Sequence, residues 1–131
     1  MIVDSSALLA VIFNEPDAAR YEAALAAART RRIPSPNWVE VAIVVEGRAD
    51  DALRGRFETM ADILEVSVAP FLAVHAAEAQ RAWRQFGRGR HPAKLNYGDC
   101  MAYGFAAAEG EPLLFKGGDF ALTDIEPALK D

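Results

Sequence analysis

Short apolar segments alternate with longer helix-forming segments along this chain. Short apolar runs bounded by turn residues are typical of buried strands, and Ala-rich stretches favour helices. The expected strands are residues 2–3, 32–34, 65–69 and 112–115, with a last short one within 124–129. The expected helices are residues 6–13, 16–29, 35 to 45 or 48, 50–64, 72–86 and 96–110. Such alternation implies a central parallel sheet, with ligands beyond the carboxyl ends of its strands.

The composition favours one domain. With 131 residues, 52% of them hydrophobic, residues 1–131 are expected to form a single domain around its own core. Cys100 is the only cysteine, so no intrachain disulfide can form and the reducing cytoplasm is the simplest location. The first residues contain neither a basic region nor a long apolar run, so we expect no signal peptide and no membrane span.

The net charge of −5 argues by itself against a nucleic-acid-binding protein, whose surface is usually basic. The charge is unevenly distributed, however, and a bound cation would invert the field around converging acidic residues. Arg29, Arg31 and Arg32 form one basic cluster. A second cluster, a candidate RNA-backbone contact, contains Arg81, Arg84, Arg88, Arg90 and Lys94. Either cluster could equally be an ordinary solvated face.

Two aspartates follow expected strands. Asp4 comes directly after residues 2–3, and Asp119 lies a few residues after 112–115. Each has a structural explanation, since Asp4 could cap the next helix and Asp119 lies in a Gly-rich turn. Asp99 has one as well, because it stands three residues after Asn96 and could complete a capping box.

Glu40 is the only charged residue in the apolar run 38–45. A helix this apolar is expected to be largely buried, and a buried carboxylate needs a partner or becomes protonated. Asp99 is likewise the only charge in residues 97–106. A hard cation, Mg²⁺ or Mn²⁺, would relieve the repulsion between converging carboxylates. A protonated or hydrogen-bonded core glutamate is the alternative, and His75, His91 and Cys100 suit packing or surface roles better than catalysis.

Four segments together resemble a known family. Residues 2–10 (IVDSSALLA) and 35–40 (SPNWVE) are similar to the first two acidic motifs of PIN domains. Residues 95–103 (LNYGDCMAY) and 114–120 (LFKGGDF), the latter continued by Thr123 to Ile125, resemble the third and fourth. The order and spacing cover nearly the whole chain. The most similar group is the VapC-type toxins of bacterial toxin–antitoxin pairs.

The resemblance implies a three-layer α/β/α sandwich and an acidic pocket that holds one or two Mg²⁺ or Mn²⁺ ions. Ser6 matches the hydroxyl residue that supports the first aspartate, and Asp124 an auxiliary acidic position. Gly118 departs from the asparagine often found there, which puts one supporting hydrogen bond in doubt. The implied acidic quartet, both catalytic and metal-binding, is Asp4, Glu40, Asp99 and Asp119.

The implied activity is endoribonucleolytic cleavage by metal-activated water, with no residue as nucleophile. One alternative is a catalytically silent PIN-fold protein that binds RNA or a partner. Another is an aspartate-nucleophile phosphotransferase of the haloacid-dehalogenase kind, which usually carries a second aspartate where Ser6 stands.

The resemblance also implies a cognate antitoxin and a homodimer. The expected antitoxin groove lies along the helix of residues 6–13, with Leu8, Leu9, Ile12 and Phe13 exposed beside Trp38. An antitoxin arginine near the acidic quartet could compete with the metal. The alternative is that these side chains fill the core.

Overall fold

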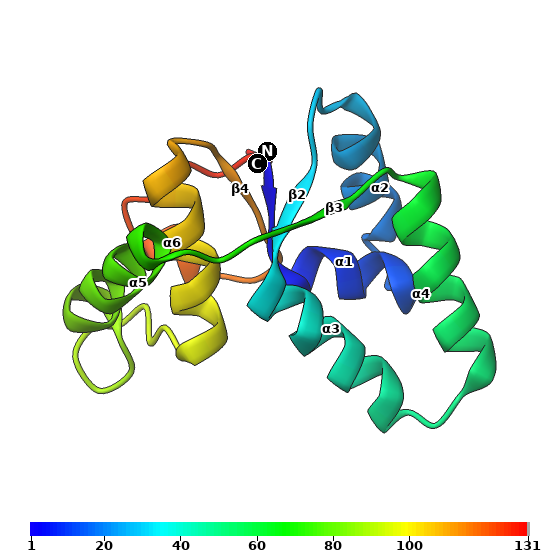
Figure 1. Cartoon of the computed structure of the whole chain (residues 1–131), viewed down its shortest axis with the longest axis horizontal. Helices are drawn as coiled ribbons and strands as arrows, with labels where there is room; N and C mark the ends of the chain where they lie inside the picture. Colours follow the sequence, from blue (N-terminus) through cyan, green and yellow to red (C-terminus); the bar gives the residue numbers. More distant parts are fainter. Residues whose placement is uncertain (131) are drawn as a thin grey trace.

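The structure, a computed structural model, describes residues 1–130 as a parallel sheet between two groups of helices (Figure 1). The sheet has the order β3-β2-β1-β4, and every neighbouring pair is parallel. Helices α5 and α6 cover one face, and α1 to α4 cover the other. The strands are β1 (Ile2–Val3), β2 (Arg32–Pro34), β3 (Ser67–Ala69) and β4 (Leu113–Leu114). The helices are α1 (Ser5–Ile12), α2 (Ala18–Ala27), α3 (Ser35–Gly47), α4 (Asp51–Ile63), α5 (Ala73–Phe86) and α6 (Tyr97–Glu109), followed by a 3₁₀ turn, Phe120–Leu122. The expected three-layer α/β/α fold is confirmed.

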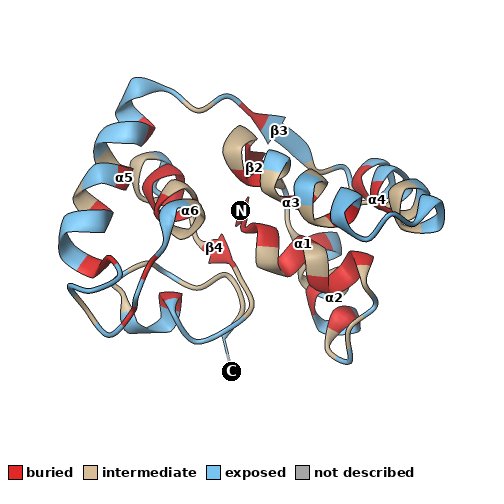
Figure 2. Cartoon of the chain, turned by 90° about the horizontal axis from the view of Figure 1, so that it is seen from below, coloured by how far each residue is buried: buried red, intermediate tan, exposed pale blue. Residues whose placement is uncertain are grey.

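The two central strands divide their side chains between two cores. Ile2 and Leu113 pack among the side chains of α5 and α6, whereas Val3 and Leu114 pack on the α1 side. This follows from the two-residue period of a strand, which sends successive side chains to opposite faces. Figure 2 shows the result, with buried residues concentrated on the parts of α1 and α6 that face the sheet.

Two local expectations were wrong. Residues 124–129 form no strand, but only a single parallel bridge between Leu113 and Pro127, in which the Leu113 amide donates to the Glu126 carbonyl and the Ala128 amide donates to the Leu113 carbonyl. The pair Ser35-Pro36 predicts an N-cap followed by proline at the first helical position, but Ser35 is the first residue of α3 and Pro34 occupies the cap position without a side-chain hydrogen bond. Pro36 still lies in the first turn, where its missing N–H costs nothing. Among residues 1–130, no helix is long and apolar enough to cross a bilayer.

Candidate active site

The predicted acidic residues lie at the ends of elements that meet at the carboxyl edge of the sheet. Asp4 directly follows β1, and its backbone amide donates to the Leu114 carbonyl of β4 (2.9 Å). Glu40 lies in α3, which continues directly from β2, and Asp99 lies in the first turn of α6. Asp119 follows β4 and precedes the 3₁₀ turn. Parallel pairing therefore gathers residues from four separate sequence motifs at one edge.

Asp4 is almost fully buried. Its Oδ2 accepts hydrogen bonds from the Ser6 amide (3.0 Å) and the Ser6 hydroxyl (2.5 Å), while its buried Oδ1 has no hydrogen-bond partner. Burial raises the pKa of Asp4 to about 7, the Ser6 hydrogen bonds oppose the rise, and the Asp99 and Glu40 carboxylates add to it. The Ser6 hydroxyl also accepts from the Lys116 amide (2.9 Å) and so joins Asp4 to the loop after β4.

Glu40 is half-buried and accepts a hydrogen bond from the Ser5 hydroxyl. The expectation that its helix is largely buried was wrong. Of the run 38–45 only Val41 and Val45 are buried, because α3 packs along one side while Val39 and Ile43 remain 53% and 66% exposed.

Gly98 of α6 lies against the Glu40 carboxylate. A Cβ atom at position 98 would come within 2.5 Å of Glu40 Oε2. Beside it the fully buried Asn37 donates from Nδ2 to the Gly98 carbonyl (3.0 Å), and its Oδ1 has no partner. Sequence reasoning missed Ser5, Asn37 and Gly98. A polar Asn37 next to an apolar run was the only signal available.

Asp99 is half-buried and forms a capping box with Asn96. Its carboxylate accepts from the Asn96 amide (3.0 Å), and its own amide donates to Asn96 Oδ1 (2.9 Å). Burial raises the pKa of Asp99, the Asn96 hydrogen bond opposes this, and the Asp119 and Glu40 carboxylates raise it further. The capping explanations for Asp4 and Asp99 are therefore both correct, and they do not exclude a second role.

We call Asp4, Glu40, Asp99 and Asp119 the acidic cluster. Their negative charges act on one another. The carboxylates of Glu40 and Asp99 raise the pKa of Asp4, and those of Glu40 and Asp119 raise the pKa of Asp99. Nevertheless, within residues 1–130 no three His, Cys, Asp or Glu side chains are gathered tightly enough to hold a metal ion as they stand. The donor set still suits a hard cation, because it consists of oxygen atoms and includes the unpartnered Asp4 Oδ1.

The remaining candidates divide into bound and exposed groups. The Asp124 carboxylate accepts from the Tyr103 hydroxyl. Arg81 is held by Glu78, Gln85 and Tyr103. The other basic residues of the segment are exposed, and the positive charge of Arg88 lowers the pKa of Asp99. These exposed residues are Arg84, Arg88, Arg90 and Lys94.

The expected groove along α1 was wrong. Leu8 and Ile12 are fully buried, and Leu9 and Phe13 pack partly against the same core. Exposed apolar side chains do lie on α3, where Val39 and Ile43 border a hollow of about 460 Å³ that adjoins Glu40. This α3 hollow is lined by Pro36, Val39, Glu40, Ile43, Val44, Tyr97, Gly98 and Met101.

Comparisons with known proteins agree with this architecture. Residues 1–126 match the family model described as the PIN domain. The chain is 43% identical over 128 residues to ribonuclease VapC30 of Mycobacterium tuberculosis, covering 95% of each chain. It is 41% identical over 130 residues to ribonuclease VapC28 of the same organism, covering 98% of each. It is 40% identical over 125 residues to ribonuclease VapC of Mycolicibacterium smegmatis, covering 95% of this chain and 97% of that one.

Proposed function

The chain belongs to the PIN domain family, and from this premise we propose that it is a metal-dependent endoribonuclease, the toxin of a toxin–antitoxin pair. Its full-length similarity to proteins named VapC ribonuclease supports the activity. The observation that carries the proposal is the buried Asp4 carboxylate. One of its oxygens lacks any partner, and the charges of Glu40 and Asp99 act on it.

The acidic cluster is the proposed catalytic and metal site. A bound Mg²⁺ or Mn²⁺ ion would supply the positive charge that stabilises the transition state and acidifies the attacking water. Ser6 orients Asp4, and Ser5 orients Glu40. Water loses a proton to solvent and adds to phosphorus, the bond from phosphorus to a ribose oxygen breaks, and the leaving oxygen takes up a proton. Cys100 is a poor nucleophile, because it is buried and burial raises the pKa of its thiol to about 11.

We expect the exposed basic residues to hold the RNA backbone, which positions the strand without reading its sequence. Arg88 lies close enough to lower the pKa of Asp99 and is therefore the best placed to contact the phosphate next to the one cleaved. Arg81 contributes less, since its guanidinium already has intramolecular partners. A cytoplasmic location remains a prediction based on the single cysteine.

The direct test is cleavage of single-stranded RNA with Mg²⁺, with Mn²⁺ and with EDTA. Asp99→Asn should lower the cleavage rate by orders of magnitude, because a charged ligand is lost, while the capping box and the fold persist. Asp62→Asn is the matched control, since Asp62 is exposed on α4. RNA binding without cleavage by the unmodified protein would indicate a silent PIN-fold protein. Hydrolysis of a small phosphate ester instead of RNA would indicate a phosphotransferase.

The antitoxin is proposed to bind at the α3 hollow, where exposed Val39 and Ile43 adjoin Glu40. An arginine on the antitoxin segment would pair with carboxylates of the acidic cluster and compete with the cation. Mixing with the co-encoded neighbour should abolish cleavage, and mutating that arginine should restore it. If inhibition survives removal of every arginine in the bound segment, blockage by arginine is wrong. A homodimer is also expected, and sedimentation equilibrium of the purified protein tests it.

A further inference from the structure

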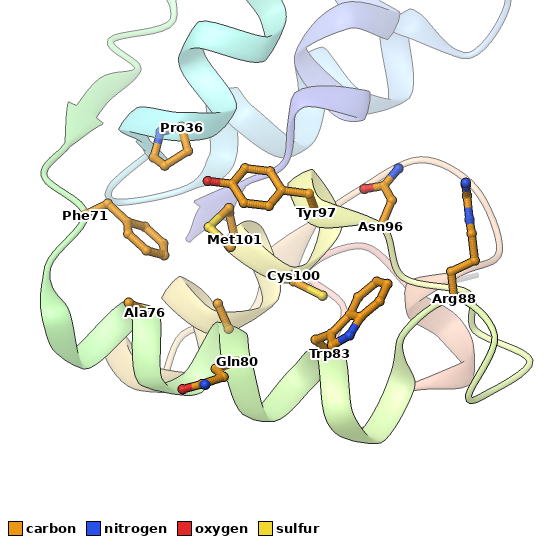
Figure 3. Close-up of a pocket in the computed structure, with 11 residues that line it drawn as sticks. Pro36, Phe71, Ala76, Gln80, Trp83, Arg88, Asn96, Tyr97, Cys100 and Met101 are labelled. Carbon is orange, nitrogen blue, oxygen red and sulfur yellow. The ribbon is translucent and has the colours of Figure 1, made fainter.

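A second hollow lies between α5 and the first half of α6. It has a volume of about 650 Å³, within the usual range of small-ligand sites. Its walls are mainly apolar, and a few polar side chains contribute to them. The lining includes Pro36, Phe71, Trp83, Tyr97, Cys100 and Met101, with Gln80, Arg88 and Asn96 among the polar members. We call it the α5–α6 hollow. In Figure 3 Tyr97 and Met101 extend from α6 toward Phe71 and Pro36, while Trp83 rises from α5 toward Cys100.

Two aromatic rings of this hollow are exposed to solvent. Tyr97 is 76% exposed and Trp83 is 39% exposed. The Trp83 indole is also held in place, because it lies directly against the backbone of Gly87. A Cβ atom at position 87 would come within 2.8 Å of two carbons of the indole ring. The hollow thus presents two solvent-exposed rings, and the contact with Gly87 fixes the position of one of them, Trp83.

The α5–α6 hollow adjoins the acidic cluster. Asn96, Tyr97 and Cys100 line it, and Asp99 lies in the same helical turn. Tyr97 and Met101 also border the α3 hollow, which contains Glu40. A strand with one phosphate at the acidic cluster would therefore bring a neighbouring base to these rings.

The charge beside the hollow favours a polyanion. Arg88 lines it, and Arg84 is exposed in the last turn of α5. Exposed aromatic rings next to basic side chains are the usual surface for single-stranded nucleic acid, since every base has a face that can stack. Asn96 adds an amide Nδ2, a donor of the type that pairs with base edges, since its Oδ1 already accepts from the Asp99 amide. An apolar protein segment would gain nothing from the two arginines.

We propose that the α5–α6 hollow binds an unpaired nucleobase of the RNA substrate, stacked on Trp83 or Tyr97, beside the phosphate held at the acidic cluster. The proposal rests on the proposed ribonuclease function and names the side chains that hold one base of the strand. In a duplex the faces of the bases are already stacked on their neighbours and are not available to the rings.

The test uses a short single-stranded oligoribonucleotide with Ca²⁺ in place of Mg²⁺, so that the acidic cluster carries a cation, and gel electrophoresis checks that the oligonucleotide stays intact during the binding measurement. In a Trp38→Phe background, Trp83 is the only tryptophan, and stacking should quench its fluorescence. Removing one base at a time from the oligonucleotide should reveal one position where an abasic nucleotide weakens binding about tenfold or more. The substitutions Trp83→Leu and Tyr97→Leu should weaken binding of the intact oligonucleotide by a similar factor. In these variants the intact and abasic oligonucleotides should bind with the same affinity. Ile63→Ala, which truncates an exposed apolar side chain on α4, should change neither.

Several results would overturn the proposal. The base lies elsewhere if removing it lowers the affinity by the same factor in the unmodified protein and in both ring variants. An unchanged oligonucleotide affinity in Trp83→Leu and Tyr97→Leu, with a changed sedimentation mass, would make the hollow an interface between copies. Cleavage by the unmodified protein is measured separately with Mg²⁺ and Mn²⁺. If it cleaves but shows no base-dependent binding, this inference fails and the ribonuclease function stands. If the protein shows base-dependent binding but cleaves no RNA, the base site stands and the ribonuclease function fails.

Discussion

At the scale of single residues, Asp4 combines two roles that sequence reasoning treats as alternatives. Its Oδ2 caps the start of α1 through the Ser6 amide, and its Oδ1 is buried without a partner. A capping residue needs only one oxygen, so the second oxygen is available for a ligand. An unpaired buried carboxylate oxygen is costly to the folded state, and proteins accept such costs mainly at functional sites.

This cost gives a prediction about pH. The pKa of Asp4 is about 7 in the folded chain, against its usual 3.8. Because the folded state binds the proton more tightly, the contribution of Asp4 to stability is complete below about pH 4 and is lost as pH rises toward 7. Asp4→Asn should therefore stabilise the metal-free protein at pH 8 by roughly 2–4 kcal/mol, and much less at pH 4.

Chemical denaturation in EDTA at pH 4, 6 and 8 measures this difference. Adding Mn²⁺ at pH 8 should stabilise the unmodified protein and leave Asp4→Asn nearly unchanged, since the variant lacks the ionised oxygen. A stability difference that does not vary with pH would show that the buried carboxylate is already neutralised by a protein partner.

At the scale of elements, the contact between α3 and α6 positions the site. Asn37 of α3 donates to the Gly98 carbonyl at the start of α6, and the missing side chain of Gly98 leaves room for the Glu40 carboxylate. The hydrogen bond and the close approach together determine how far Glu40 lies from Asp99, which occupies the next position of α6 after Gly98.

Gly98→Ala tests this contact. The added Cβ would meet only the end of the flexible Glu40 side chain, so the carboxylate should move while the helices stay in place. We expect about the same or slightly higher stability, as for other Gly→Ala changes in helices, together with a clear fall in kcat.

Two matched variants interpret the result. Gly55→Ala places the same methyl group on α4 with nothing within 4 Å and should change stability without changing kcat. Gly104→Ala would push into the Ala79 backbone of α5 at 2.5 Å and should destabilise the fold. Thermal denaturation and RNA cleavage distinguish the three variants. An unaltered kcat in Gly98→Ala would mean that the position of Glu40 does not matter.

At the scale of the whole molecule, the protein and its proposed RNA substrate both carry a negative net charge. The net charge of −5 repels RNA at long range, so binding depends on where the cations lie. Arg84, Arg88, Arg90 and Lys94 are exposed on the segment from α5 to α6, whereas Arg32 and Arg54 form ion pairs with neighbouring glutamates. Arg88, which also acts on the Asp99 carboxylate, is thus available to a phosphate at the acidic cluster.

Salt dependence tests this distribution. Arg88→Ala should weaken binding of single-stranded RNA of any sequence and reduce the slope of log affinity against log salt by roughly 0.7–1. Arg54→Ala removes the same charge from α4, where Arg54 pairs with Glu46 and Asp51. Fluorescence anisotropy between 50 and 300 mM salt compares them. The same slope in both variants would mean that RNA affinity follows net charge alone.

The sequence by itself determined most of the elements, and it proposed the four acidic residues of the site. Residues 2–3 and 32–34 were predicted as strands, and Asn96 as a cap, because each depends on neighbours a few residues away. Residues 124–129 failed as a strand because their pairing with Leu113 stops after one bridge, and the length of a pairing depends on a partner strand that is distant in the chain.

Only the tertiary structure decided which surfaces are free and which residues orient the site. Leu8 and Ile12 are buried while Val39 and Ile43 are exposed, although all four are aliphatic residues on helices. The hydrogen bond from Ser5 to Glu40 spans 35 positions, and that from Asn37 to Gly98 spans 61. Local periodicity records which face of a helix is apolar. It does not record which neighbour covers that face, because this depends on the packing of elements distant in the chain.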